Sequence, residues 1–100
     1  MRNIVLFCSA GMSTSLLVNK MRAAAAEINY DCKINAYALA SSKVKGKDAD
    51  IILLGPQIRF SKTKVERDCP GKLIECIDMQ LYGTMNGAEV IAQVRKALGD

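Results

Sequence analysis

The residues best suited to chemistry lie near the start of the chain, where an apolar run over residues 4–7 ends at Cys8. A run of mostly small residues follows: Ser9, Ala10, Gly11, Met12, Ser13, Thr14 and Ser15. This order predicts a buried strand that stops at Cys8, a short loop, and then a helix. Backbone N–H groups in such a loop, with a helix N-terminus behind them, bind anions. We therefore expect Cys8 to act as a nucleophile toward phosphorus.

The distribution of charge near Cys8 supports this expectation. No Asp or Glu precedes Glu27, although acidic residues are favoured in the first turn of a helix. The positive end of the helix dipole is thus left for a ligand anion or a thiolate. The alternative is that Cys8 is a small buried residue at the end of a strand, and that Ser13 or Thr14 is a helix cap.

The composition indicates one domain over residues 1–100. Half of the residues are hydrophobic and 5% are aromatic, which suits an aliphatic α/β core. No apolar run approaches the roughly eighteen residues of a membrane span. No signal peptide is recognisable, because Arg2 and Asn3 lead directly into a short strand-like run. We expect a cytoplasmic protein without direct membrane insertion.

Histidine is absent, and the four cysteines stand at positions 8, 32, 69 and 76 without a CxxC pair. This pattern argues against a structural metal site and against disulfides in a cytosolic protein. It also excludes a Ser-His-Asp triad or a Cys-His dyad within the chain. We expect no metal and no cofactor. We interpret Cys32 and Cys76 as strand residues and Cys69 as a surface or loop thiol.

The net charge of +4 is modest and is not gathered into a block of lysines. No aromatic residues alternate with basic ones, so nucleic-acid binding is not indicated. The densest basic stretch is 59–67, and it contains Arg59 and Lys62. It is either a solvated helix face or a docking surface for an acidic or phosphorylated partner.

The rest of the chain alternates strands and helices. Strands are predicted at about 3–8, 32–37, 51–54 and 73–77, and helices at about 13–29, at 58–68 and from Asn86 onward. The segment 38–49 is predicted to be a loop or a short irregular helix. The first helix has apolar residues spaced to cover one face: Leu17, Met21, Ala24 and Ile28. The last helix is expected to have Asn86 as its cap and to bury Ile91, Val94 and Leu98.

This alternation predicts a single doubly wound, four-stranded parallel sheet with helices on both faces, a flavodoxin-like or phosphatase-like topology. Two continuously apolar strands and two mixed ones fit the strand order 2-1-3-4. Ligands of such folds bind outside the carboxyl ends of the strands, where the chain reverses direction. The loops Cys8–Ser15 and Gly55–Gln57 would meet there.

Residues 4–18, which include Phe7-Cys8-Ser9-Ala10-Gly11-Met12-Ser13-Thr14, resemble the start of enzyme IIB proteins of the bacterial phosphotransferase system (PTS) for sugar uptake. The similar branch is the lactose/cellobiose/diacetylchitobiose type, whose domain would span residues 1–100. Further segments also match: 49–58 with its Leu-Gly-Pro-Gln, Ile77-Asp78 and Leu81-Tyr82-Gly83.

The resemblance implies a phosphocarrier. The cysteine matching Cys8 would accept a phosphoryl group from a phosphohistidine on a IIA subunit or domain. It would pass the group to a sugar bound in the membrane permease IIC, such as cellobiose, chitobiose or lactose. Main-chain N–H groups of residues 9–15 would hold the phosphoryl oxygens, helped by hydroxyls of Ser13, Thr14 and Ser15, and Gln57 could add an amide.

Two other classes of protein remain as alternatives. Low-molecular-weight tyrosine phosphatases and arsenate reductases also place a cysteine after a first strand, but they need an arginine six positions later, where this chain has Thr14. They also need a carboxylic acid, for which Asp78 is the nearest candidate. The second alternative is a non-enzymatic flavodoxin-like or receiver-type binding module. Flavodoxin-like sites hold the flavin ring between aromatics, and here Tyr82 alone sits near a predicted loop.

Overall fold

Four parallel strands form one sheet in the computed structural model, which describes residues 1–9 and 11–100, without the side chains of residues 11–13. The strands are β1 (Arg2–Cys8), β2 (Cys32–Ala38), β3 (Ile51–Leu54) and β4 (Leu73–Cys76). Their order across the sheet is β2-β1-β3-β4, and neighbouring strands are parallel. The predicted sheet and its strand order are confirmed, and each strand lies within two residues of its predicted limits.

Helical segments connect the strands. They are α1 (Gly11–Glu27), η1 (Leu39–Ser41), α2 (Ser42–Lys45), η2 (Pro56–Ser61), α3 (Lys62–Asp68), α4 (Met79–Gly83) and α5 (Gly87–Leu98). The helix predicted at 58–68 is in fact a 3₁₀ segment followed by α3, and α4 was not predicted. In the described part of the chain, no helix is long and apolar enough to cross a membrane.

The two central strands are buried on both faces, which explains their continuous apolar sequences. All residues of β3 and residues 4–8 of β1 are buried. The edge strands β2 and β4 are mixed, with buried positions next to half-exposed ones. In the pairing register, Phe7 of β1 lies opposite Leu54 of β3, and Cys8 lies opposite Ala38 of β2. The carboxyl ends of the strands therefore meet at one edge of the sheet.

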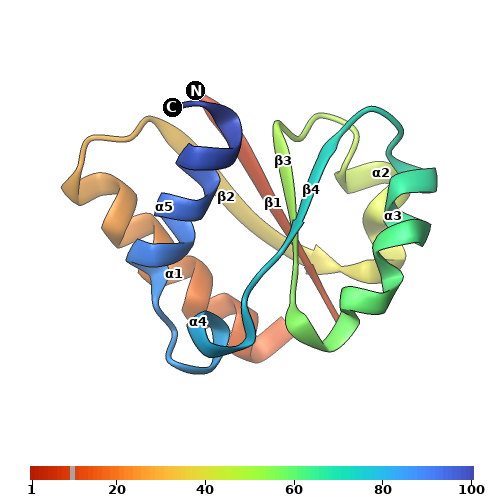
Figure 1. The fold of residues 1–100 in the computed structure, drawn as a ribbon, viewed down its shortest axis with the longest axis horizontal. Helices are drawn as coiled ribbons and strands as arrows, with labels where there is room; N and C mark the ends of the chain where they lie inside the picture. Colours follow the sequence, from red (N-terminus) through yellow and green to blue (C-terminus); the bar gives the residue numbers. More distant parts are fainter. Residues whose placement is uncertain (10) are drawn as a thin grey trace.

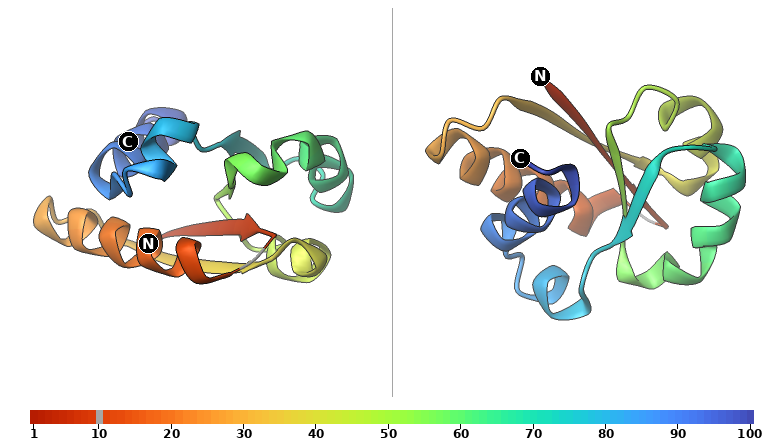
Figure 2. Two further views of the ribbon diagram at one scale, coloured as in Figure 1. Left: turned by 90° about the horizontal axis from the view of Figure 1, so that it is seen from below. Right: turned by 45° about the horizontal axis from the view of Figure 1, so that its top comes forward.

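Helices cover both faces of this sheet, as predicted (Figures 1 and 2). Helices α1 and α5 pack side by side on one face, and their core includes Leu17, Met21, Ile91 and Val94. Helices α2 and α3 lie on the other face, where Phe7, Ile52 and Val65 belong to a second buried cluster. Because side chains of β1 alternate between these clusters, the strand is held from both sides.

Helix α1 ends earlier than its apolar spacing predicts. Its last residue is Glu27, because Asn29 takes a left-handed conformation with a φ of 54° and the Tyr30 N–H donates to the Ala25 carbonyl oxygen. The side chain of Ile28 consequently lies beyond the helix and is 49% exposed, so the prediction that it faces the core is wrong. Ala25 is buried there instead.

The predicted positions of the other cysteines are partly corrected. Cys32 and Cys76 lie in strands, as predicted. Cys69 is not a surface thiol: it is buried, and its Sγ donates to the Ser42 carbonyl oxygen at 3.2 Å. Burial and the nearby Asp68 carboxylate raise the pKa of Cys69, and burial also raises the pKa of Cys32. Both thiols are therefore poor nucleophiles near neutral pH.

A polar cluster joins the two ends of the chain, which lie close together (Figure 1). The Arg2 guanidinium donates twice to the Asp100 carboxylate, at 2.9 Å each, and the Tyr30 hydroxyl donates to the same carboxylate at 2.5 Å. The bonds from Arg2 and Tyr30 lower the pKa of Asp100 from 3.8 to about 2. Burial and the bond to Asp100 raise the pKa of Tyr30 from 10.0 to about 12.

The cluster predicts how stability changes with pH. Since the pKa of Asp100 is lower in the folded than in the unfolded chain, its stabilisation is present above pH 4 and is lost as the pH falls toward 2. The difference in unfolding free energy between the wild type and Asp100→Asn should thus be largest near neutral pH and vanish near pH 2. Denaturant unfolding from pH 2 to 7 checks this. A difference that does not change with pH would contradict it.

Helix α5 begins so close to α1 that only glycine fits at its first position. A Cβ atom on Gly87 would lie 2.5 Å from the carbonyl carbon of Lys20 and 2.6 Å from the Met21 nitrogen. These are backbone atoms, so the helices themselves would have to move apart. By contrast, a Cβ atom on Gly83 would meet no atom within 4 Å.

We predict that Gly87→Ala lowers the free energy of unfolding by about 1–3 kcal/mol, because it overpacks the contact between α1 and α5. The matched change Gly83→Ala should shift it by no more than about 0.5 kcal/mol, since that position is open. Urea denaturation of both variants measures the difference. Equal effects would show that the close approach of the helices does not limit stability.

Candidate active site

The segments that follow β1, β3 and β4 meet at the carboxyl edge of the sheet. The Gly55 N–H, just after β3, donates to the Phe7 carbonyl oxygen at 3.1 Å, and the Ile77 N–H, just after β4, donates to the Leu54 carbonyl oxygen at 2.9 Å. These bonds extend the parallel pairing one residue beyond the strands. They bring Gly55 beside the end of β1, where Cys8 stands, as the predicted switch point requires.

Cys8 is the last residue of β1 and is 3% exposed. Its Sγ lies 3.9 Å from the carbonyl oxygen of Tyr37 on the neighbouring strand β2, a weak thiol hydrogen bond. Ser9, the next residue, is exposed. The thiol thus lies at the rim of the sheet, between the buried core and an exposed loop.

The expected anion loop leads directly into α1. This helix begins at Gly11, two residues earlier than predicted, and carries no acidic residue in its first turn. The first four N–H groups of an α-helix have no acceptor within the helix and face any anion placed before it. Ala10 lies outside the described residues, as do the side chains of Gly11, Met12 and Ser13.

The Thr14 side chain points into the protein. Thr14 is 1% exposed, and its Oγ1 lies 3.1 Å from the Oη of Tyr82, which is itself 8% exposed. The Thr14 hydroxyl is bonded to Tyr82 in the interior, and its expected part in holding a phosphoryl group stays a prediction. Ser15, the next residue of α1, is exposed.

Gln57 follows β3, as expected, but it lies in the 3₁₀ segment η2 and not in a loop. It is exposed, and its amide folds back over Gly55, since a Cβ atom there would come within 3.0 Å of Gln57 Oε1. A cavity of about 310 Å³ opens beside it between η2 and α4. The residues lining this cavity are Pro56, Gln57, Met79, Tyr82 and Gly83.

The Asp78 side chain is hydrogen-bonded to the backbone of α4. Its carboxylate is the N-cap of α4, and it accepts hydrogen bonds from the N–H groups of Gln80 at 2.8 Å and Leu81 at 3.3 Å. Helix capping is therefore sufficient to explain an aspartate at this position, and a role as a catalytic acid is not needed. The basic residues Arg59 and Lys62 are exposed, on η2 and at the start of α3.

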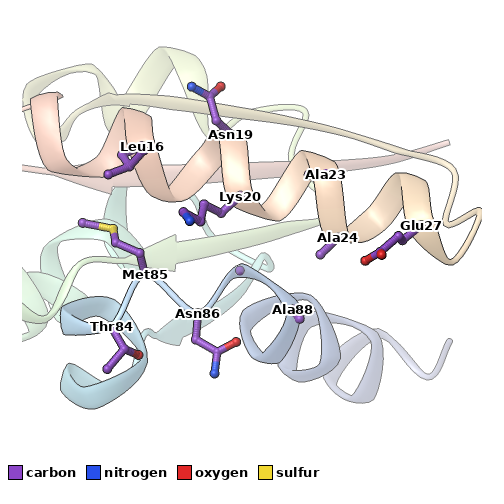
Figure 3. Close-up of a pocket in the computed structure, with 11 residues that line it drawn as sticks. Leu16, Asn19, Lys20, Ala23, Ala24, Glu27, Thr84, Met85, Asn86 and Ala88 are labelled. Carbon is purple, nitrogen blue, oxygen red and sulfur yellow. The ribbon is translucent and has the colours of Figure 1, made fainter.

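A wider groove, of about 590 Å³, lies away from these residues, between α1 and the junction of α4 with α5 (Figure 3). Leu16 and Lys20 of α1 face Met85 across it. Of the predicted site residues whose side chains the structure describes, none lines this groove. The described part of the chain contains no group of three or more Cys, Asp or Glu residues that could hold a metal ion.

Tyr82, which is bonded to Thr14, was not among the site residues predicted from the sequence. A signal was available, because Leu81-Tyr82-Gly83 is one of the segments that resemble the IIB family. The missing information was the short helix α4, which turns the Tyr82 side chain toward α1.

Comparison with known proteins identifies the family of this chain. The family model described as "PTS system, Lactose/Cellobiose specific IIB subunit" matches residues 3–93. The chain is 38% identical over 95 residues to the oligo-beta-mannoside-specific EIIB component of Bacillus subtilis, covering 93% of this chain and 92% of that protein. It is 44% identical over 96 residues to the galactose-specific EIIB component of Lactococcus lactis subsp. cremoris, covering 89% of each.

A solved structure is similar as well. The solution structure of a cellobiose-specific phosphotransferase IIB component from Borrelia burgdorferi superimposes with a TM-score of 0.81 at 38% identity, covering 98% of this chain and 92% of that one. Fold, motif and relatives therefore agree. The chain belongs to the lactose/cellobiose-specific IIB subunits, the phosphotransferase components of sugar-specific PTS systems.

Proposed function

We propose that residues 1–100 form one phosphocarrier domain in which Cys8 carries the phosphoryl group. IIB components work with IIA and IIC partners in general. In this proposal the donor is a phosphohistidine on a IIA protein or domain, and the acceptor is a sugar bound in the membrane permease IIC. The protein works in the cytoplasm, beside that permease. The observation that carries the proposal is the position of Cys8 at the end of β1, with only two residues between it and the N-terminus of α1.

The chemistry consists of two substitutions at phosphorus. First, the Cys8 sulfur attacks the phosphoryl group; the S–P bond forms as the P–N bond of the phosphohistidine breaks, and the thiol proton ends on the leaving imidazole nitrogen. In the second, a sugar hydroxyl oxygen attacks phosphorus, the S–P bond breaks, and the hydroxyl proton ends on the Cys8 sulfur. The partners supply imidazole and sugar, so this chain needs no histidine.

The chain's own contribution is to hold the transferring group in place. The N–H groups of residues 9–15 would bind the equatorial oxygens, and the dipole of α1 would stabilise their charge. Gln57, whose side-chain oxygen lies beside Gly55, would lend an amide. The low exposure of Cys8, 3%, would limit the access of water to the phosphocysteine.

The same residues argue against a hydrolase. Thr14 stands six positions after Cys8, where a phosphatase carries arginine, and its buried hydroxyl is bonded to Tyr82. Asp78, the candidate for the acid, is occupied in capping α4. A carrier benefits from lacking both groups, because they would promote loss of the phosphoryl group to water.

We propose a beta-linked disaccharide, such as cellobiose, chitobiose or lactose, as the sugar. Relatives named for oligo-beta-mannosides and for cellobiose support this class, and the relative named for galactose shows that similar IIB chains serve different sugars. The choice of sugar then belongs to the permease, since this chain would hold only the phosphoryl group.

Replacing the nucleophile tests the proposal. Wild-type protein incubated with phosphoenolpyruvate, the general phosphotransfer proteins and IIA should gain one phosphoryl group by intact mass, whereas Cys8→Ser should gain none. Cys76→Ser is the matched control, because Cys76 is a half-buried cysteine at the end of β4. It should be phosphorylated like the wild type.

The phosphorylated wild type should then lose its phosphoryl group when permease membranes and sugar are added. Phosphorylation of Cys8→Ser to the wild-type extent would rule out Cys8 as the acceptor. Rapid release of inorganic phosphate without membranes would favour the phosphatase alternative.

We further propose that Arg59 and Lys62 help to dock a partner. Both are exposed on the segment that follows β3, near the edge that holds Cys8. Arg59→Glu with Lys62→Glu should slow transfer from phosphorylated IIA by roughly tenfold at low salt, through weaker electrostatic attraction.

The effect of this double change should shrink as salt rises, since salt screens exposed charges. The combined change Lys47→Glu with Lys96→Glu is the control: it alters the charge by the same amount at two exposed positions, one after α2 and one in the last turn of α5. If transfer rates and their salt dependence equal those of the wild type, residues 59–67 are merely a solvated surface.

A further inference from the structure

We propose that Tyr82 is a positioning residue for phosphoryl transfer, which it assists by holding the first turn of α1 through Thr14. This inference rests on the proposed function of Cys8. Its basis is a hydrogen bond between two buried hydroxyls, Oγ1 of Thr14 and Oη of Tyr82, 3.1 Å apart. With 1% and 8% exposure, neither residue is well placed to exchange this bond for one to water.

Thr14 occupies a position that matters for an anion. It is the fourth residue of α1, so it belongs to the turn whose N–H groups lack an acceptor within the helix. A shift of this turn would move those N–H groups away from the oxygens of a phosphoryl group on Cys8. The Thr14 side chain ties the turn to Tyr82, while the free N–H groups of such a turn point out of the helix N-terminus, toward an anion placed there.

Tyr82 is itself held firmly, although α4 has only five residues. The helix is capped at one end by Asp78, and at the other end the Thr84 hydroxyl donates to the Gln80 carbonyl oxygen at 2.8 Å. Just beyond α4, the Asn86 N–H donates to the Leu81 carbonyl oxygen at 2.9 Å. Side-chain and backbone bonds thus fix the segment that carries the Tyr82 ring.

The ring of Tyr82 also reaches the loop after β3. A Cβ atom on Gly55 would lie 3.9 Å from Tyr82 Cε2. The Gly55 N–H donates to the carbonyl oxygen of Phe7, the residue before Cys8 in β1. Tyr82 therefore lies next to α1, which follows Cys8 in the chain, and next to Gly55, which is bonded to the residue before Cys8. A residue in this position can set the distance between the end of β1 and the start of α1.

The experiment removes one hydroxyl at a time. Tyr82→Phe keeps the ring, Thr14→Val keeps the shape of the side chain, and Thr14→Ser keeps the hydroxyl. For turnover between phosphorylated IIA and permease membranes with sugar, we expect the first two changes to lower kcat by about tenfold, while the KM for IIA changes by less than about twofold. Thr14→Ser should restore kcat to within about threefold of the wild type. The combined Thr14→Val and Tyr82→Phe variant should be no slower than either single variant, because both remove the same bond.

Tyr30→Phe is the matched control, because it removes a tyrosine hydroxyl that is bonded to Asp100, in the cluster at the chain ends. Its kcat should equal that of the wild type. Thermal unfolding of each variant is measured in parallel. A role in stability alone would lower the melting temperature and leave kcat unchanged, and that result for both Tyr82→Phe and Thr14→Val would overturn the proposal. A wild-type protein that accepts no phosphoryl group at all would instead overturn the proposed function.

Discussion

The parallel pairing of β1 with strands on both of its sides is the constraint on which the rest of this structure depends. Residues 4–8 of the strand are buried, and their side chains alternate between the core under α1 and α5 and the core under α2 and α3. A strand held in this way has a fixed register, since a slip of one residue would exchange the two sets of side chains. The position of Cys8 at the carboxyl edge is thus set by packing along the whole of β1, and not by local loop structure.

The site has contributions from distant parts of the chain because the sheet is parallel. After each strand the chain must cross back to the other end of the sheet before the next parallel strand begins, so the segments after β1, β3 and β4 all lie at one edge. They do so although 47 positions separate Cys8 from Gly55 and 23 more separate Gly55 from Asp78. Backbone bonds from Gly55 to Phe7 and from Ile77 to Leu54 hold these segments together. The same geometry places Tyr82 against Thr14, 68 residues away in sequence.

The sequence predicted those features that depend on periodic patterns or on backbone chemistry. The run at 51–54 could only be a buried strand, and Asn86 was recognisable as the cap of α5. Helix α4 was missed because five residues are too few to show a helical period, and its cap, Asp78, was considered as a catalytic acid. The burial of Cys69 also could not be predicted, since it depends on a contact with Ser42, which is distant in sequence. Both α4 and the burial of Cys69 depend on contacts between residues that a local sequence pattern does not show.

The inward orientation of Thr14 fits the needs of a carrier. A phosphatase places a guanidinium at this position to stabilise the charge on the transferring group, and this lowers the barrier for attack by water as well as by any other acceptor. In this chain the corresponding side chain is neutral, and its hydroxyl is bonded to Tyr82. On the proposed function, stabilisation would come from backbone N–H groups and from the α1 dipole, which would hold the group without a carboxylate to activate water. In this proposal, the pair of Thr14 and Tyr82 positions the first turn of α1 and adds no positive charge to the phosphoryl group. The groups that exchange a proton during transfer, an imidazole and a sugar hydroxyl, are then supplied only by the partners.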